Sequence, residues 1–223
     1  VSGNPARHRR APFFRERCIM KLLQFRDPNS TRSCRLGLVD GDEVIDLTDG
    51  GGPGSVYELY YGGGGNTSGF NSAIETAATR AAGARRLSLD DLLGARGADV
   101  AHMEKPVSGP AEDPYKLRVW LAGVTHEDSA KLREIEAKHA TGDAVNVYEQ
   151  KYRECAAGGR PELFSKGDPD TVVGHGQPLS RPADTERLVP ETELVSVYAL
   201  NSKGQVERIG YTGGNDATDN GIR

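Results

Sequence analysis

Glycine and proline interrupt this chain so often that a large share of it is expected to be loop and turn. The sequence holds 28 Gly and 12 Pro among its 223 residues. Glycine favours turns and proline breaks helices and inner strands, so these residues divide the chain into short segments. Their combined number still lies below the roughly 25–30% of a chain that is typical of low-complexity disorder. We therefore expect a loop-rich globular protein.

The net charge of −4 hides a basic segment at the N-terminal end. Residues 1–19 carry five arginines and one glutamate. Because no apolar run makes this segment a signal peptide, we expect residues 1–19 to be a disordered basic leader before a natural start at Met20. A nucleic-acid arm or a targeting peptide remains an alternative for the leader.

Charge, hydropathy and cysteine content exclude several classes of protein. The acidic body argues against a nucleic-acid binder, and no apolar run approaches the roughly 18 residues that a membrane span needs. The three cysteines, Cys18, Cys34 and Cys155, form no C-x-x-C pair. We therefore expect a cytoplasmic protein with no nucleic-acid or membrane partner.

Turn signals and apolar patterning predict two units, at residues 20–102 and 116–223, with a proline-rich linker at 103–115. The first unit is a small β-containing domain with strands at 21–25, 35–39 and 43–47 and helices at 55–61 and 70–82. The second has a strand at 117–124, helices at 128–139 and 144–157, short strands at 163–164 and 171–173, and a hairpin of 194–200 and 206–212. The sequence thus predicts a mostly β, α+β protein.

Three carboxylates are expected to meet at the open end of that hairpin. Glu191 and Glu193 alternate along a strand, so both side chains point to one face. A symmetric turn at Asn201-Ser-Lys-Gly204 places Glu191 opposite Gly214, with Asp216 within about 7 Å along the strand. Carboxylates that converge need a neutralising partner, and Mg²⁺, Mn²⁺ or Ca²⁺ suits an all-oxygen set. Alternatively, the glutamates are solvated surface charges and Asp216 is a turn residue.

Several motifs together resemble the fumarylacetoacetate hydrolase family. They are Pro190-Glu-Thr-Glu-Leu194, Gly210-Tyr-Thr-Gly-Gly-Asn-Asp216, Pro161-Glu-Leu-Phe-Ser-Lys166 and Val172-Val-Gly-His-Gly176. The resemblance implies a mixed β-sandwich roll, a dimer or higher homo-oligomer, and a small-molecule 2-oxo acid as substrate. It also implies that Glu191, Glu193 and Asp216 bind Mg²⁺, and that Lys166 and Asn215 contact the substrate; a solvated strand-end lysine is the alternative for Lys166.

Two departures from the family pattern refine this expectation. Ser129 stands where the hydrolases carry a catalytic histidine, and a serine cannot act as that general base near neutral pH. The segment Gly123-Val-Thr-His-Glu-Asp-Ser129 resembles instead the 2-keto-3-deoxy-sugar-acid dehydratase branch, in which the position of Glu162 is an acid/base residue. The lysine segment and closing strands of that branch lie beyond Arg223, so the roll is expected to be incomplete at its C-terminal end.

The resemblance therefore implies a metal-dependent lyase in which Glu162 removes a proton from C3 and the cation stabilises the resulting enolate. The residues around Arg133 on the following helix are expected to form a charged solvent face, in a region that forms a lid in the family. One alternative is a hydrolase that cleaves a carbon–carbon bond of an acylpyruvate. Another is a non-catalytic protein that binds 2-oxo acids.

Overall fold

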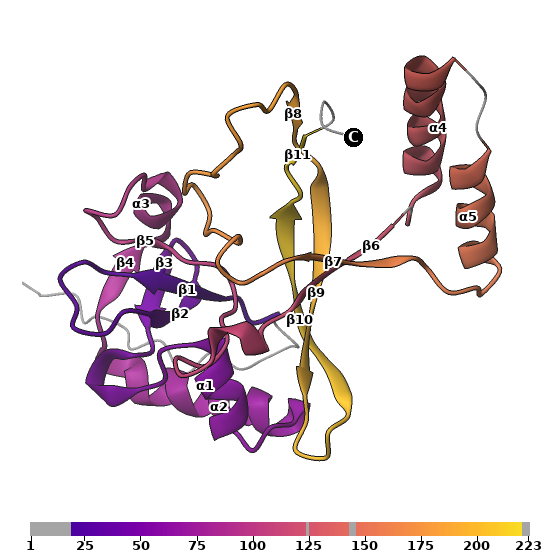
Figure 1. The fold of residues 1–223 in the computed structure, drawn as a ribbon. Coiled ribbons are helices and arrows are strands. Elements are labelled where there is room, and N and C mark those ends of the chain that lie inside the picture. Colours follow the sequence, from indigo (N-terminus) through magenta and orange to yellow (C-terminus); the bar gives the residue numbers. More distant parts are fainter. Residues whose placement is uncertain (1–18, 124, 143–145, 220–223) are drawn as a thin grey trace, which may run out of the picture.

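The N-terminal half forms a five-stranded antiparallel sheet covered by helices on both faces (Figure 1). The computed structural model describes residues 19–123, 125–142 and 146–219, so the basic segment at 1–18 lies outside the described residues. The strand order is β4-β3-β2-β1-β5. The strands are β1 (Leu22–Arg26), β2 (Arg35–Asp40), β3 (Glu43–Asp46), β4 (Arg86–Ser88) and β5 (His102–Met103). The expected first three strands are thereby confirmed.

Helices α1 (Val56–Gly62) and α2 (Thr67–Arg80) pack on one face of the sheet, and α3 (Leu89–Gly94) lies against the other. Single 3-10 turns lie at Asp49–Gly51, Ala81–Gly83 and Pro114–Lys116. The side chain of Ser88 accepts a hydrogen bond from the Asp91 amide, which caps α3. Such a cap satisfies one of the amide groups left unpaired at a helix start.

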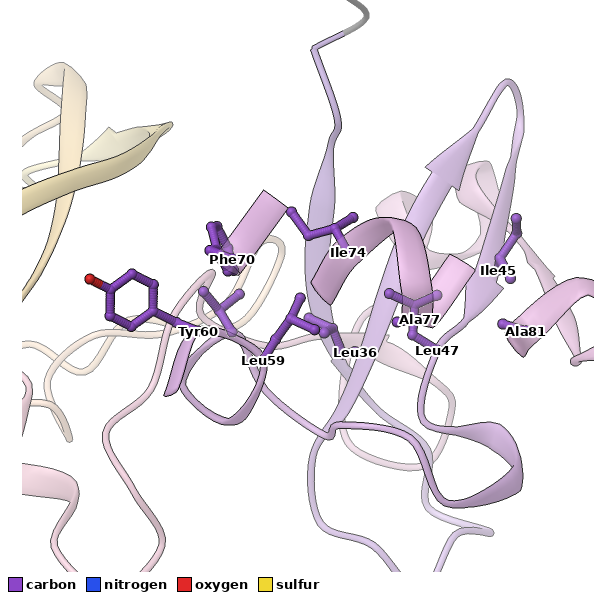
Figure 2. Packing of buried hydrophobic residues seen from close by; sticks show 10 residues of the cluster. Leu36, Ile45, Leu47, Leu59, Tyr60, Phe70, Ile74, Ala77 and Ala81 are labelled. Carbon is purple, nitrogen blue, oxygen red and sulfur yellow. The ribbon is translucent and has the colours of Figure 1, made fainter. Parts of the chain in front are cut away.

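The main core lies between the sheet and helices α1 and α2 (Figure 2). Leu36 from β2 and Leu47, directly after β3, meet Leu59, Phe70 and Ile74 from the helices. Apart from Ala130 and the prolines Pro110 and Pro169, every buried apolar side chain among the described residues lies between Leu23 and Ala95. Hydrophobic burial is therefore concentrated in the N-terminal half, which we expect to supply most of the folding free energy.

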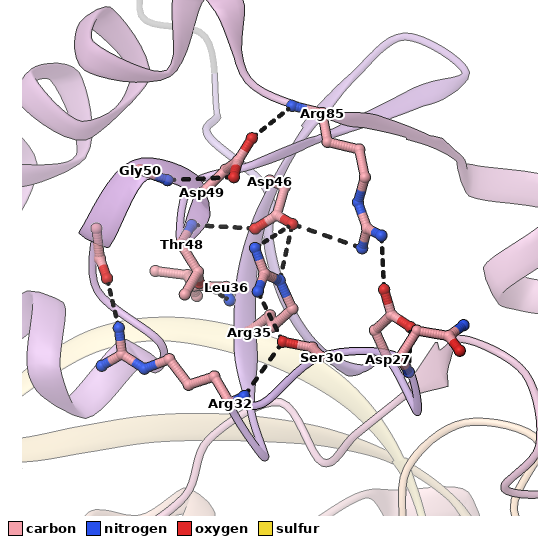
Figure 3. Close-up of polar contacts among 12 residues, drawn as sticks. Asp27, Ser30, Arg32, Arg35, Leu36, Asp46, Thr48, Asp49, Gly50 and Arg85 are labelled. Carbon is pink, nitrogen blue, oxygen red and sulfur yellow. Dashed lines mark hydrogen bonds and ion pairs between the residues drawn. The ribbon is translucent and has the colours of Figure 1, made fainter.

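A buried ionic network is centred on Arg35 of β2 and Asp46 of β3 (Figure 3). The Asp46 side chain is fully buried, and its Oδ2 lies 2.7 Å from Arg35 Nη2 and 3.6 Å from Arg85 Nη2. Its Oδ1 accepts a hydrogen bond from the Thr48 amide at 3.1 Å. Arg85 continues the network to Asp27 at 2.6 Å. The buried charge is thus paired and hydrogen-bonded, as its burial requires.

The segment expected to be a linker, 103–115, is tied to the first strand. The buried Gln24 side chain donates to Lys105 O at 3.0 Å and to Ser108 Oγ at 3.2 Å, and it accepts from the Val56 amide at 2.9 Å. Glu104 also donates its amide to Gln24 O at 2.9 Å. The start of this segment therefore belongs to the sheet of the first unit, while the division into domains stays a prediction.

The C-terminal half consists of two-stranded ladders and a pair of helices, and every ladder described is antiparallel. The ladders are β6 (Val119–Ala122) with β7 (Leu163–Gly167), β8 (Leu188–Val189) with β11 (Thr218–Asp219), and β9 (Thr192–Leu200) with β10 (Val206–Asn215). Helices α4 (Glu127–Thr141) and α5 (Val147–Ala156) lie beside each other at the outer end of β6 and β7 (Figure 1). None of the described helices combines the length and apolar character needed to cross a membrane.

These elements form a β-rich α+β fold, in agreement with the expected class, whereas the sandwich roll stays a prediction. The strand predicted at 171–173 is wrong: Thr171 is in a turn in which both its amide and its hydroxyl donate to Asp168 O. A β-branched residue favours strands only where a neighbouring strand pairs with it.

Candidate functional site

The turn of the β9–β10 hairpin sets the first part of the register. Asn201 donates its amide to Gln205 O at 2.8 Å, so the loop holds three residues, 202–204. Gly204 has a φ of +74°, the left-handed conformation that a three-residue hairpin loop needs at its last position. Val206 consequently pairs with Leu200, one residue away from the register of the predicted symmetric turn.

A β-bulge then shifts the register again between Arg208 and Gly210. Had the pairing of Arg208 with Tyr198 continued unbroken, Asp216 would lie opposite Pro190 and point to the other face. With the bulge, Asp216 donates its amide to Glu191 O at 2.9 Å. The prediction that Glu191 lies opposite Gly214 is therefore wrong, because Gly214 pairs with Glu193. The two shifts place Asp216 opposite Glu191, on the same face as both glutamates.

Contacts with the N-terminal core hold the hairpin where the bulge occurs. Ile209, at the bulge, and Ala199 pack against the main hydrophobic cluster. Glu207 Oε2 accepts hydrogen bonds from the amide and hydroxyl of Thr67, each at 2.8 Å, and from the Tyr60 hydroxyl at 3.3 Å. In Figure 2 the Tyr60 hydroxyl points away from the other labelled members of the cluster. These contacts stabilise the register that determines the face of Asp216.

Two cations from other elements contact the carboxylates at the far end of the hairpin. Arg133 Nη2 of α4 lies 2.6 Å from Glu191 Oε1, and these side chains are 26% and 24% exposed. Lys166 Nζ of β7 lies 2.9 Å from Asp216 Oδ2, whose side chain is 14% exposed. Arg133 thus departs from the mostly charged solvent face that was expected of this helix. The structure brings the expected metal-ligand residues together with a lysine predicted to bind the substrate.

The side-chain carboxylate of Glu193 makes no hydrogen bond or ion pair with any residue that the structure describes. Desolvation raises the pKa of its carboxyl, and the negative charges of Asp216 and Glu191 raise it further. His126 and Lys166 oppose this increase through their positive charges. The three carboxylates are therefore close enough to repel one another, and Glu193 lacks a direct counter-charge.

The donor chemistry of this face fits a hard divalent cation. Glu191, Glu193 and Asp216 offer carboxylate oxygens only, which Mg²⁺, Mn²⁺ and Ca²⁺ prefer. In the described part of the chain, no three His, Cys, Asp or Glu side chains are already arranged as a chelating group. Two of the three acids are instead neutralised by Arg133 and Lys166. Binding of a cation would therefore require these side chains to rearrange.

The other predicted site residues lie around this face in different ways. Asn215 Oδ1 accepts the Glu191 amide at 3.0 Å, so it braces the ligand strand. Glu162 is exposed at the start of β7, with its Oε1 3.8 Å from Lys151 Nζ of α5. Ser129 is exposed in the first turn of α4 and makes no side-chain hydrogen bond with the described residues. The structure thus brings Asn215 to the carboxylates, whereas Glu162 and Ser129 make no direct contact with them.

We expect Glu193→Gln to raise the free energy of unfolding at neutral pH when a chelator removes divalent cations. A carboxyl whose pKa is raised by folding destabilises the fold above that pKa, because its ionised form is disfavoured there. The gain should shrink as the pH falls toward the ordinary glutamate value of about 4.3. Urea unfolding across this pH range measures the effect, with the exposed Glu186→Gln as control. A variant less stable than the parent at neutral pH would contradict the expectation.

Comparison with known proteins gives two partial matches. The chain is 34% identical over 106 residues, 48% of its length, to a protein of Saccharolobus solfataricus named "2-dehydro-3-deoxy-D-arabinonate dehydratase". It is 33% identical over 104 residues, 47% of its length, to a protein of Haloferax volcanii named "Probable 2-keto-3-deoxyxylonate dehydratase". The matches span 32% and 31% of those proteins, so the chain covers about a third of the relatives' length. No family model matches the chain, and no solved structure matches it significantly.

Proposed function

We propose that this chain belongs to an enzyme that removes water from a 2-keto-3-deoxy sugar acid with the help of a divalent cation. The observation that carries the proposal is the single face shared by Glu191, Glu193 and Asp216, bordered by Arg133 and Lys166. The names of the two partial relatives support the same class of reaction, since both are sugar-acid dehydratases.

The charge of this face supports the need for a cation. Three carboxylates against the two side-chain cations leave one excess negative charge, which repels an anionic 2-oxo acid. A bound divalent cation would reverse that sign. It would also supply Lewis-acid polarisation of the 2-oxo group, which makes the C3 proton more acidic.

The residues of the chain supply binding and proton transfer in this proposal. Lys166, now paired with Asp216, lies where it can exchange that carboxylate for the carboxylate of the substrate. Glu162 takes the C3 proton as general base, and the hydroxyl leaves from the next carbon. The proton and the hydroxyl together form one water. Glu162 directly precedes the β7 strand, and Lys166 lies near the end of that strand beside a register shift, so one short segment carries both groups.

The test is incubation of the protein and Mg²⁺ with 2-keto-3-deoxypentonic acids, followed by mass spectrometry. We expect the substrate to lose the mass of one water and an acylpyruvate to remain uncleaved. Cleavage of the acylpyruvate with Ser129 in place would favour the hydrolase alternative. Saturable binding of the sugar acid without turnover would favour the non-catalytic alternative.

We expect Mg²⁺ or Mn²⁺ to stabilise the protein against thermal unfolding. A ligand that binds only the folded state contributes about 2.7 kcal/mol at 100 times its Kd, which raises Tm by about 5–10 °C for a chain of this size. Differential scanning calorimetry with cation and with chelator measures the shift. Glu191→Gln should abolish it, whereas Glu186→Gln should leave it unchanged. An equal shift in the parent and in Glu191→Gln would count against this site.

A further inference from the structure

The pair formed by α4 and α5 extends from the body of the protein and carries little core of its own. Figure 1 shows both helices at the outer end of β6 and β7, apart from the N-terminal sheet. Leu132, Ile135 and Val147 on these helices are each more than half exposed. Because apolar burial is small here, individual polar contacts should contribute strongly to the position of the helices.

Arg133 provides such a contact through its 2.6 Å ion pair to Glu191, the residue directly before β9. Its neighbours on α4 make local interactions instead. Lys131 pairs with Glu127 of the same helix at 2.7 Å, and Glu134 accepts the Glu149 amide of α5 at 2.9 Å. Arg133 therefore connects the helical pair to the carboxylate face.

Glu191 is held by its own backbone and cannot readily follow a moving helix. Its carbonyl accepts the Asp216 amide at 2.9 Å, and its amide donates to Asn215 Oδ1 at 3.0 Å. A divalent cation on Glu191 would repel the guanidinium that now contacts the same carboxylate. Of the two partners in this ion pair, Arg133 is therefore the one that can move, and α4 would move with it.

We propose that Arg133 couples the position of the α4–α5 pair to the occupancy of the carboxylate face. Without a divalent cation, Arg133 binds Glu191 and holds the helices against the hairpin. A cation at Glu191, Glu193 and Asp216 displaces Arg133 and releases the helices. This inference rests on the cation site of the proposed function, and it makes Arg133 a positioning residue.

Mn²⁺ affinity, measured by titration with detection of free Mn²⁺ by electron paramagnetic resonance, tests the competition. Removing the competing charge with Arg133→Ala should tighten Mn²⁺ binding by about 5- to 150-fold, the usual range for coupled sites. Arg133→Lys, which keeps the charge, should restore part of the competition. Lys131→Ala removes a charge from the same helix and should leave the affinity unchanged. Unchanged or weaker binding by Arg133→Ala would overturn the proposal.

Limited proteolysis of the α4–α5 pair supplies a readout that does not depend on turnover. In a chelator, Arg133→Ala should be cleaved there faster than the parent and Lys131→Ala. Mn²⁺ should accelerate cleavage of the parent toward the rate of Arg133→Ala. If the parent binds Mn²⁺ and neither effect is seen, the coupling is wrong and the cation site stands. If neither protein binds Mn²⁺, the cation site of the proposed function fails and the coupling fails with it.

Discussion

Replacing Glu162 by Gln should lower the rate of water loss from a 2-keto-3-deoxy sugar acid by about 10²–10⁴-fold, the usual contribution of a general base. Gln keeps the size of the side chain and cannot accept the C3 proton. Single-turnover measurements isolate this step from product release. Since Glu162 makes no contact with the carboxylate face, its loss should leave the Mn²⁺ affinity unchanged.

Glu154→Gln is the matched control, because Lys151 is within ion-pair distance of both glutamates, 3.4 Å from Glu154 and 3.8 Å from Glu162. Both variants remove one carboxylate from Lys151, but only the change at residue 162 removes the proposed base. We therefore expect near-parental rates for Glu154→Gln. Equal rates for the two variants would remove Glu162 from the mechanism and leave the cation site unaffected.

Asp46→Ala should lower the free energy of unfolding by about 3–5 kcal/mol, the cost of breaking a buried ion pair from one side. The change leaves Arg35, whose side chain is only 14% exposed, without its direct counter-charge. It also removes the acceptor of the Thr48 amide and one partner of Arg85. Urea unfolding followed by circular dichroism measures the loss.

Asp40→Ala provides the comparison for Asp46, because Asp40 pairs with Arg86 at the surface, where the side chains are 60% and 40% exposed. An exposed pair contributes about 0–1 kcal/mol, so this variant should unfold close to the parent. Replacing Asp46 and Arg35 together by Leu and Met should recover part of the stability, since it removes both buried charges. Similar losses for Asp46→Ala and Asp40→Ala would contradict the role given to burial.

Local patterns were sufficient to predict the N-terminal strands and the shared face of Glu191 and Glu193. Alternation along β9 places Glu191 and Glu193 on one face whatever follows in the chain. The position of Asp216 opposite Glu191 could not be predicted in the same way. It depends on a three-residue loop and on a bulge at Ile209, and the core stabilises that bulge from outside the hairpin. Where one face of a strand is buried, its packing against the rest of the protein determines the register.

The contact of Arg133 with Glu191 also could not be predicted from the sequence. A charged residue on a polar helix predicts a solvent face, and Lys131 on the same helix conforms to that pattern. The contact of Arg133 with Glu191 joins residues 58 positions apart, through a helix position that local periodicity does not encode.

The attachment of β10 to α1 and α2 has a consequence for attempts to dissect the protein. A fragment that begins at residue 116 would keep Glu191, Glu193 and Asp216 in its sequence. It would lose Tyr60, Thr67 and the cluster that packs on Ile209. Its two long strands could then pair without the bulge, which would divide the acids between opposite faces. The N-terminal unit therefore helps to fix the strand register on which the site depends. A chimera that replaces this unit must keep the apolar cluster against which Ile209 packs.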